Sequence, residues 1–362
     1  MAGVGRQLLT SAEAPRRAPT QSLLVHARAW GAERRSVVVA VLLLLVLLAV
    51  YWSVDPSART AGSVQGFANG GIGLGLVAAG EAVVVVAGGL DLSIGSILSL
   101  LNVILVSQMG ASAGSQLGVS IEVLATGVAV SATNGLLVAG LNLPSILVTL
   151  SMSFLWQGVA LLVRSQPGGT VQSGFASTLS GSFLISIPNS TYLLVAAVLV
   201  WWATKRTGWV RRLYALGSEA EAAPSSSRRV RSTIVAGHAL AGLFYGAAAL
   251  LLTAMSGSGD PNLGSTLVVT AIAAVVLGGT RLGGGRGDPL TAILGAFIVT
   301  SVDDILFAFQ VPAFYTGVLN GAILFAAVLK GLVLDGGSGV GRWGSPAAPG
   351  ASTPAAPQDG RA

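Results

Sequence analysis

Long apolar stretches recur through most of the chain, and polar or charged residues interrupt them at fairly regular intervals. Each stretch has about 17 or more residues, close to the length that a helix needs to cross a ~30 Å hydrocarbon core. Charges, prolines or Gly–Ser clusters bound each one. The pattern predicts ten membrane-spanning helices, near residues 36–53, 64–87, 92–110, 117–140, 144–163, 190–204, 233–255, 266–280, 288–308 and 313–333.

The composition agrees with a membrane protein and excludes other classes. Of 362 residues, 52% are hydrophobic and 9% are charged, whereas soluble domains have roughly 25% charged residues. So few charges cannot cover the surface of a soluble globule, and such an apolar chain is not a disordered one. The 49 glycines suit helices that approach one another closely in a membrane. We therefore predict an all-α polytopic membrane protein in which Gly-rich segments break some of the helices.

Basic residues gather in an N-terminal tail and in a central loop at residues 205–231. Basic loops next to apolar spans stay on the cytoplasmic side during insertion. With ten spans, only Arg59 and Arg164 of the 20 Lys and Arg residues fall outside. This asymmetry predicts that both termini are cytoplasmic in a multi-pass plasma-membrane protein. It also explains the net charge of +6 without a nucleic-acid partner.

Three regions follow from the same pattern. Residues 1–35 are predicted to be a disordered basic cytoplasmic tail, and residues 336–362 a disordered C-terminal tail. Residues 36–335 form the transmembrane domain. The apolar run that begins at Ser36 has no Ala-x-Ala-like cleavage site, so we expect a retained first span and not a signal peptide.

Several kinds of reactive site cannot be built from this sequence. The chain has no cysteine, which excludes disulfides, thiolate nucleophiles and cysteine-ligated metals. Its two histidines, His26 and His238, lie in different regions, which argues against a paired-histidine metal site. No Gly-Lys dipeptide occurs, so there is no phosphate-binding P-loop. We predict no catalytic residue, metal or cofactor in this chain, and any ATP and Mg²⁺ must be bound by a partner.

The first of three glycine-rich strings connects the second and third predicted spans. Gly88 and Gly89 permit a backbone break between the two helices. Asp91 and Ser93 can cap the helix that follows. Lipid offers no hydrogen bonds to such a break, so the backbone must be satisfied inside the protein or line a water-filled path. Both interpretations stay open: an ordinary helix start, or one wall of a translocation pathway.

The sequence Gly-Leu-Asp-Leu-Ser-Ile-Gly-Ser at residues 89–96 resembles the hallmark of the permease subunits of ribose-type ABC importers. These subunits serve monosaccharides such as ribose, xylose and galactose, or a furanosyl autoinducer. Further strings resemble the same family in the same order, at residues 134–138, 143–150, 213–222, 260–262 and 277–287. The resemblance implies a homodimer or heterodimer of permease copies in the bacterial inner membrane. ATP hydrolysis in separate ABC ATPase subunits would drive it, and an extracytoplasmic substrate-binding protein would supply it.

The second string lies in the central loop. Gly217 can end one helix, and Ser218 can cap a short helix that begins at Glu219. Glu219 and Glu221 would then lie near the positive end of that helix. The resemblance implies that this helix, which includes Ala222, docks in a groove of the ATPase subunit and couples the two proteins.

The residues after this predicted helix depart from the family. Members usually continue with Leu-Ser-Gly-Ile, whereas this chain has Pro-Ser-Ser-Ser at residues 224–227. The proline ends the helix early and removes apolar docking contacts. A solvated basic loop that only sets the topology is the alternative interpretation.

The third string runs from residue 278 to residue 287 and carries Arg281 and Arg286. Its glycines permit a tight return between two helices, and its arginines favour the cytoplasmic side. We predict a close-packed turn, with an ATPase contact or a gate hinge as the alternative. The candidate gate and turn residues are Gly88, Gly89, Gly95, Gly278, Gly279 and Arg286.

Acidic residues inside predicted spans are the remaining candidates. A charge at Glu81, in an otherwise apolar segment, costs ~3 kcal/mol, so this residue must be neutral, paired or facing water. The resembling family commonly has glutamine there, which implies interhelical hydrogen bonds; a pore-facing solute contact is the alternative. Asp303 and Asp304 project about 100° apart on the ninth span, so we expect one of them to border an aqueous cavity. The candidate translocation residues are Glu81, Asp91, Ser93, Asn134, Asp303 and Asp304.

Other functions remain compatible with these patterns. A branched-chain amino acid or nucleoside permease of the same superfamily is the nearest. An ion-coupled secondary transporter would use Glu81 with one of the two later aspartates, and a membrane-embedded enzyme would turn over substrate in isolation. For an importer, the resemblance implies that the binding protein docks on the predicted outer loops near 53–63, 164–190 and 256–264.

Overall fold

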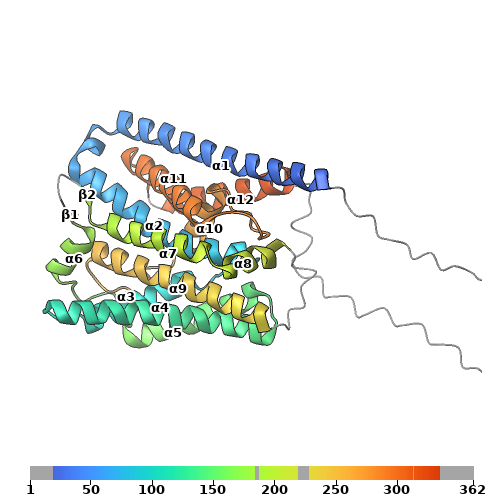
Figure 1. Cartoon of the computed structure of the whole chain (residues 1–362). Coiled ribbons are helices and arrows are strands. Elements are labelled where there is room, and N and C mark those ends of the chain that lie inside the picture. Colours follow the sequence, from blue (N-terminus) through green and yellow to red (C-terminus); the bar gives the residue numbers. More distant parts are fainter. Residues whose placement is uncertain (1–18, 184–186, 219–227, 313, 335–362) are drawn as a thin grey trace, which may run out of the picture.

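The structure, a computed structural model, describes residues 19–183, 187–218, 228–312 and 314–334, and these residues are almost entirely helical (Figure 1). The helices are α1 (Pro19–Val54), α2 (Ala61–Val86), α3 (Ile94–Gln108), α4 (Ala113–Leu141), α5 (Ser145–Val163), α6 (Ser173–Ser180), α7 (Ser190–Lys205), α8 (Gly208–Ser218), α9 (Arg228–Ser256), α10 (Leu267–Leu277), α11 (Pro289–Ala308) and α12 (Phe314–Leu334). A 3₁₀ helix, η1 (Pro56–Arg59), follows α1. Two short antiparallel strands, β1 (Ser182–Phe183) and β2 (Ile187–Pro188), follow α6.

Every predicted span coincides with a helix, which confirms the all-α membrane fold. Six helices of the described chain are long and apolar enough to cross a membrane: α1 in its Val37–Val54 part, α2, α4, α5, α9 and α11. The apolar helices α3, α7, α10 and the Tyr315–Ala326 part of α12 are shorter. The helix lengths therefore support six full membrane spans among the described residues and do not establish the predicted ten.

The span predicted at 266–280 is wrong in length. Helix α10 has 11 residues, and at 1.5 Å per residue it extends only ~16 Å, about half of a ~30 Å hydrocarbon core. The residues before and after it are not helical, and both flanking segments contain glycine. Apolar length alone therefore overestimated this helix.

Two predicted boundaries also differ from the structure. Helix α1 is already helical from Pro19, a residue that suits the first turn of a helix, so the tail predicted over residues 1–35 is shorter than expected. The loop predicted over 205–231 contains the helix α8. Residues 1–18 and the tail predicted over 336–362 lie outside the described residues.

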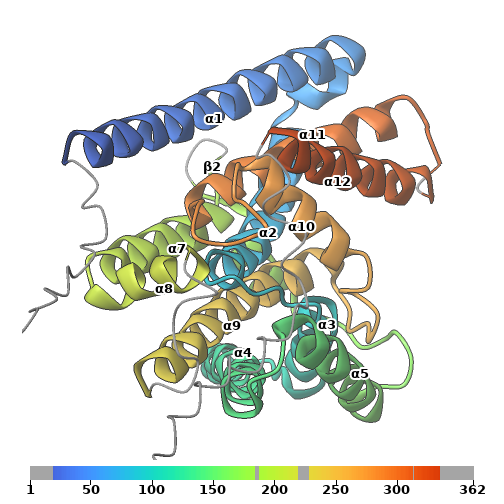
Figure 2. The same cartoon turned by 90° about the vertical axis from the view of Figure 1, so that its right-hand side faces the viewer.

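Helix α2 lies at the centre of the bundle, between α1 and α11 on one side and α3, α4 and α5 on the other (Figure 2). Each of its residues from Gly71 to Val86 is buried. A Cβ added at Gly71 would meet the ring of Phe297 on α11, and one added at Gly80 would meet the ring of Tyr245 on α9. The glycines therefore let two neighbouring helices press directly on the backbone of α2.

Helices α2 and α10 end in the same way. Gly88 after α2 has φ +85° and Gly279 after α10 has φ +87°, the left-handed conformation that glycine adopts at low cost. In both cases this glycine and the next residue donate their amides back to the last turn of the helix, as in a Schellman motif. The motif satisfies carbonyls that lipid could not, so both helices can stop inside the protein.

The two ends of the bundle differ in charge. One end, here called the basic end, carries α8 and the α10–α11 connection (Figure 1), and its basic residues include Lys205, Arg211 and Arg228. The opposite end carries η1, α6 and the two strands. At that end the hydroxyl and amide of Ser57 donate to Asp55 at 2.7 and 2.8 Å, and these bonds hold the pKa of the Asp55 carboxyl below its ordinary value.

Candidate functional site

A buried polar network begins at Glu81, which is 0% exposed at the centre of the bundle. Its Oε1 accepts the backbone amide of Asp91 at 3.2 Å, and its Oε2 accepts the hydroxyl of Tyr245 at 3.3 Å. Glu81 therefore ties α2 to the α2–α3 connection and to α9. Of the two interpretations of Glu81, this geometry favours interhelical hydrogen bonding.

The network continues through the start of α3. Asp91 Oδ1 accepts both the amide and the hydroxyl of Ser93, at 2.9 and 2.5 Å. Asn134 on α4 donates to Ser93 Oγ at 2.7 Å and accepts the indole N–H of Trp156 on α5 at 3.1 Å. Ser93 occupies the N-cap of α3 but makes no capping hydrogen bond. The predicted capping bond of Ser93 is therefore absent, because its hydroxyl donates to Asp91 and accepts from Asn134. Asp91, in contrast, accepts the backbone amide of Ser93 at the start of the helix.

Two hydroxyls on α5 satisfy the backbone of the α2–α3 break. Ser145 Oγ accepts the amide of Leu90 at 2.8 Å, and Thr149 Oγ1 accepts the amide of Leu92 at 3.0 Å. Neither residue was predicted as a partner of the break. Their i, i+4 spacing directly after Pro144 was the available signal, since it places both hydroxyls on one face of the first turns of a helix.

The predicted path residues in this network do not reach the surface in the described conformation. Glu81, Asp91, Ser93 and Asn134 are all 0% exposed. Two buried atoms nearby, Asp91 Oδ2 and His238 Nε2, have no hydrogen-bond partner within the described part of the chain. Contact of these residues with a solute therefore stays a prediction.

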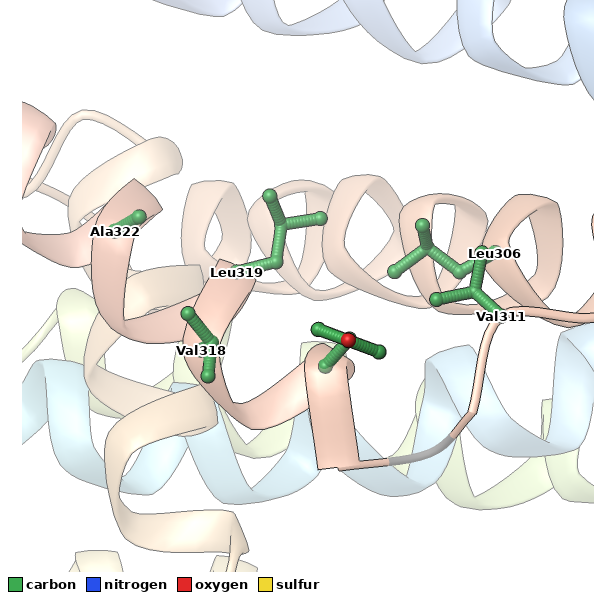
Figure 3. A pocket seen from close by; sticks show the side chains of 6 residues that line it. Leu306, Val311, Val318, Leu319 and Ala322 are labelled. Carbon is green, nitrogen blue, oxygen red and sulfur yellow. The ribbon is translucent and has the colours of Figure 1, made fainter.

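Asp303 and Asp304 lie apart from this network, near the end of α11. Both are partly buried and line a pocket of about 510 Å³ together with Phe307, Gln310 and Thr316. An apolar pocket of about 350 Å³ adjoins it between α11 and α12, and Leu306, Val311, Val318, Leu319 and Ala322 point toward it (Figure 3). The aspartates thus border a cavity that opens on the surface of the chain.

The antiparallel packing of α2 and α11 separates these aspartates from Glu81. Gly75 lies against Ile293 and Gly71 against Phe297, so Asp303 is level with the first turns of α2. At 1.5 Å per residue, Glu81 is roughly 20 Å farther along the helix axis. The pairing of Glu81 with Asp303 that an ion-coupled transporter would need is absent from this conformation of the described chain.

The three glycine-rich strings meet at one point of the basic end. The amide of Gly285 donates to the carbonyl of Val86 at 2.9 Å, and Gly217 of α8 lies against the same carbonyl. A Cβ added at Gly284 would lie 2.7 Å from Cα of Gly88 and 2.9 Å from Cα of Gly217. Backbone meets backbone here, so a side chain does not fit. We call these five residues the glycine junction.

Further contacts fasten the helices around the glycine junction. The hydroxyl of Tyr214 on α8 donates to the carbonyl of Gly287 at 2.7 Å. Asp288, which caps α11, accepts the indole N–H of Trp201 at 3.0 Å and forms an ion pair with Lys205. Asp288 was not predicted to connect α7 and α11. Its place directly before a proline at a helix start was the available signal.

Of the predicted coupling residues, the structure describes Gly217 and Ser218. Gly217 is buried in the last described turn of α8, and Ser218 is the last described residue of that helix. The segment 208–218 is therefore an amphipathic helix, and the short helix predicted to begin at Glu219 stays a prediction. Glu219, Glu221 and Ala222 lie outside the described residues.

The predicted gate and turn residues all lie at close approaches or chain reversals. Gly95 packs against the backbone of Gly264, and Gly278 against the backbone of Thr291. The carbonyl of Arg286 accepts the amide of Arg281 at 3.1 Å and closes the return before α11. These contacts establish a tight turn, whereas movement as a gate stays a prediction.

Comparison with known proteins adds the family. Residues 63–328 match the family described as the permease component of branched-chain amino acid transport systems. The chain is 29% identical to the ribose import permease protein RbsC of Escherichia coli strain K12, over 83% of this chain and 94% of that protein. It is 33% identical to the autoinducer 2 import system permease protein LsrC of Enterobacter sp. strain 638, over 82% and 85% of the two chains.

A third relative is the D-allose transport system permease protein AlsC of Escherichia coli strain K12, which is 28% identical over 79% of this chain and 88% of that protein. No solved structure matches the chain.

Proposed function

Because this chain belongs to the family of permease components matched at residues 63–328, we propose that it is the membrane-spanning subunit of an ABC importer for monosaccharides. The glycine junction is the observation that carries this function. It places α8, the end of the central helix α2 and the α10–α11 connection in direct backbone contact. A movement applied at α8 would therefore pass to the core of the bundle without a compliant side chain between them.

The proposed orientation puts the basic end in the cytoplasm, as the positive-inside rule expects. Helix α8 then faces the compartment that holds ATP. Its Val210 and Leu213 are buried in the bundle, whereas Arg211, Arg212 and Ala215 are exposed. This exposed face is the proposed docking surface for an ABC ATPase subunit, which would bind ATP and Mg²⁺.

The proposed solute is a monosaccharide, because the relatives' names refer to ribose, D-allose and autoinducer 2. We also propose that this chain has no enzymatic activity of its own and that a partner subunit hydrolyses ATP. We further propose a second permease copy beside this one and a substrate-binding protein at the opposite end. The exposed apolar residues of α5, such as Phe154 at 73%, are suited to lipid or to that second copy.

The test is uptake by proteoliposomes that contain the chain, its cognate ATPase and its binding protein. The proposal expects ATP-dependent accumulation of labelled ribose, D-allose or another monosaccharide, unchanged when the proton gradient is dissipated. Uptake of leucine or a nucleoside in place of every sugar tested would reassign the substrate class. Uptake that needs the proton gradient but no ATP would contradict the proposal and favour a secondary transporter.

A further inference from the structure

The connection between α9 and α10, residues 257–266, does not stay at the opposite end of the bundle as a surface loop. It descends along α3. Gly259 lies against Val106 near the end of α3, and the amide of Asp260 donates to Asn102 at 2.5 Å. Farther along, Gly264 donates its amide to Ser99 at 3.0 Å. The outer loop predicted near 256–264 is therefore an outer loop only in its first residues.

The depth of this segment follows from the helix geometry. Gly264 also packs against the backbone of Gly95. The contacts of the segment thus run from Val106 to Gly95, eleven residues of α3, which is ~16 Å along the helix axis. Helix α10 then covers another ~16 Å, and the two distances together equal a ~30 Å hydrocarbon core. The non-helical segment therefore ends, and α10 begins, near the middle of the membrane.

One side of this segment is held by polar side chains. Asn102 donates to the carbonyl of Ser258 at 3.1 Å as well as to Thr253 at 2.8 Å. Gln157 on α5 donates to the carbonyl of Pro261 at 2.8 Å. Asn102 is 0% exposed, and a buried amide in a membrane helix is retained where it binds otherwise unsatisfied backbone. Asn102 and Gln157 are therefore positioning residues for the segment.

The other side of the segment is polar and uncovered. Asn262, Ser265 and Thr266 are exposed, and Asn262 Oδ1 also accepts the side-chain amide of Gln157 at 3.3 Å. Thr266 occupies the N-cap of α10 but its side chain makes no capping bond, so its hydroxyl remains available. Non-helical backbone at membrane depth does not face lipid; it is buried in protein or lines a water-filled cavity. An exposed amide and two exposed hydroxyls at this depth match the second case.

We infer that residues 260–266 form a re-entrant segment that lines the solute path near the middle of the membrane, where Asn262, Ser265 and Thr266 hydrogen-bond to hydroxyl groups of the passing solute. The inference rests on the proposed function as a sugar permease. The carboxylate of Asp260 accepts the backbone amide of Asn262 at 2.8 Å. The side chains of Asn262, Ser265 and Thr266 are neutral donors and acceptors, which suits an uncharged polyhydroxylated solute.

The inference deepens the interpretation of α10 as a half-length helix. Discontinuous helices that begin near the midplane recur at solute sites of transporters, because their irregular backbone is tolerated where it lines a cavity. In this chain the break is pinned to α3 by Ser99 and Asn102. A weak, multi-point contact of this kind admits a sugar without retaining it.

The chain contains no cysteine, so single-cysteine variants test the inference directly. Asn262→Cys and Thr266→Cys should react with a membrane-impermeant maleimide in sealed proteoliposomes that contain the partner subunits. The matched control is Phe154→Cys, on α5 one turn from Gln157 and 73% exposed but on an apolar face. We expect labelling at least tenfold faster at residues 262 and 266 than at 154, and slower labelling when the transported sugar is present.

Two results would overturn the inference. One is labelling at residues 262 and 266 that is no faster than at 154. The other is oxidative cross-linking of Asn262→Cys between two permease copies without any labelling, which would make the segment a subunit interface. Labelling does not require transport, so it is separable from the uptake assay that tests the proposed function.

A transport readout separates solute contact from a structural role. Thr266→Val should lower the maximal rate of sugar uptake several-fold while ATP hydrolysis by the complex stays unchanged. Thr266→Ser keeps the hydroxyl and should restore uptake. Equal uptake by both variants would refute the assigned contact at this residue.

Discussion

The α2–α3 break depends on two hydroxyls of α5, and their removal is a sensitive test of the polar network. Ser145→Ala removes the acceptor for the amide of Leu90, and Thr149→Val removes the acceptor for the amide of Leu92. Both replacements nearly preserve the side-chain volume, so packing changes little. What changes is that backbone amides inside the bundle lose their partners.

The expected magnitudes differ between the two positions. A buried donor left without a partner costs about 1–3 kcal/mol, although interhelical hydrogen bonds in membranes average nearer 0.6 kcal/mol. Ser145 is partly exposed, so we expect a loss of about 1 kcal/mol there. Thr149 is 0% exposed and its hydroxyl also contacts the carbonyl of Leu90 at 3.1 Å. We expect a loss of about 2 kcal/mol for Thr149→Val.

The assay is thermal unfolding of the purified chain in one detergent. At about 1.3 °C per kcal/mol for a chain of this size, Thr149→Val should lower the midpoint by ~3 °C and Ser145→Ala by ~1 °C. Ser151→Ala on the same helix and Thr133→Val on α4 are matched controls, because their exposed hydroxyls bond only within their own helices. If Thr149→Val has the same unfolding midpoint as the controls, the hydroxyls of α5 do not stabilise the α2–α3 break.

Substitutions at Gly88 and Glu81 test the end of α2 and the buried polar network. Gly88→Ala should destabilise the chain by about 1–2 kcal/mol, because residue 88 has a left-handed backbone. The control Gly66→Ala, in open space on α2, should leave the unfolding midpoint equal or higher. An unchanged midpoint for Gly88→Ala would contradict the helix-end assignment. Glu81→Gln should keep ATP-dependent uptake, because the amide oxygen can accept the backbone amide of Asp91 while the NH2 group donates to the hydroxyl oxygen of Tyr245. Glu81→Leu leaves the hydroxyl of Tyr245 without this hydrogen-bond acceptor and should lower the monodisperse yield on size exclusion. Loss of uptake in well-folded Glu81→Gln would show that a carboxyl group is needed at this position.

Apolar length predicted the positions of the helices well, because a stretch that must exclude water is visible in one dimension. The predicted length of α10 was wrong, because the length of an apolar stretch does not show how deep in the membrane a helix begins. The descent of residues 257–266 into the bundle depends on partners far away in sequence, such as Asn102 and Ser99. Those residues appeared only as isolated polar positions on a predicted span.

At the candidate site, too, the sequence predicted individual residues but not how they pack together. Residue type and spacing identified three glycine-rich strings, but nothing in one dimension showed that they meet at a single junction. Helix α8 was not predicted, because residues 205–231 were interpreted as one loop in which Gly217 ends a structure. The pattern of Val210 and Leu213 buried with Arg211 and Arg212 exposed was already an amphipathic helix signal. The burial of Glu81 beside Tyr245 likewise required the packing of α9 on α2.

The central claim is that α8 passes the movement of an ATPase to α2 through the glycine junction. Gly217→Ala tests it, because the added Cβ would strike the carbonyl of Val86 and the amide of Gly285. The control is Gly208→Ala on the same helix, where a Cβ would meet only the ends of two arginine side chains, at 3.7 and 3.8 Å.

The decisive measurement is the number of sugar molecules taken up per ATP hydrolysed by reconstituted complexes whose assembly has been verified by size exclusion. We predict that Gly217→Ala lowers this ratio at least tenfold while ATP hydrolysis continues, and that Gly208→Ala leaves it unchanged. A ratio for Gly217→Ala equal to that of the wild type, in an assembled complex, would contradict the account.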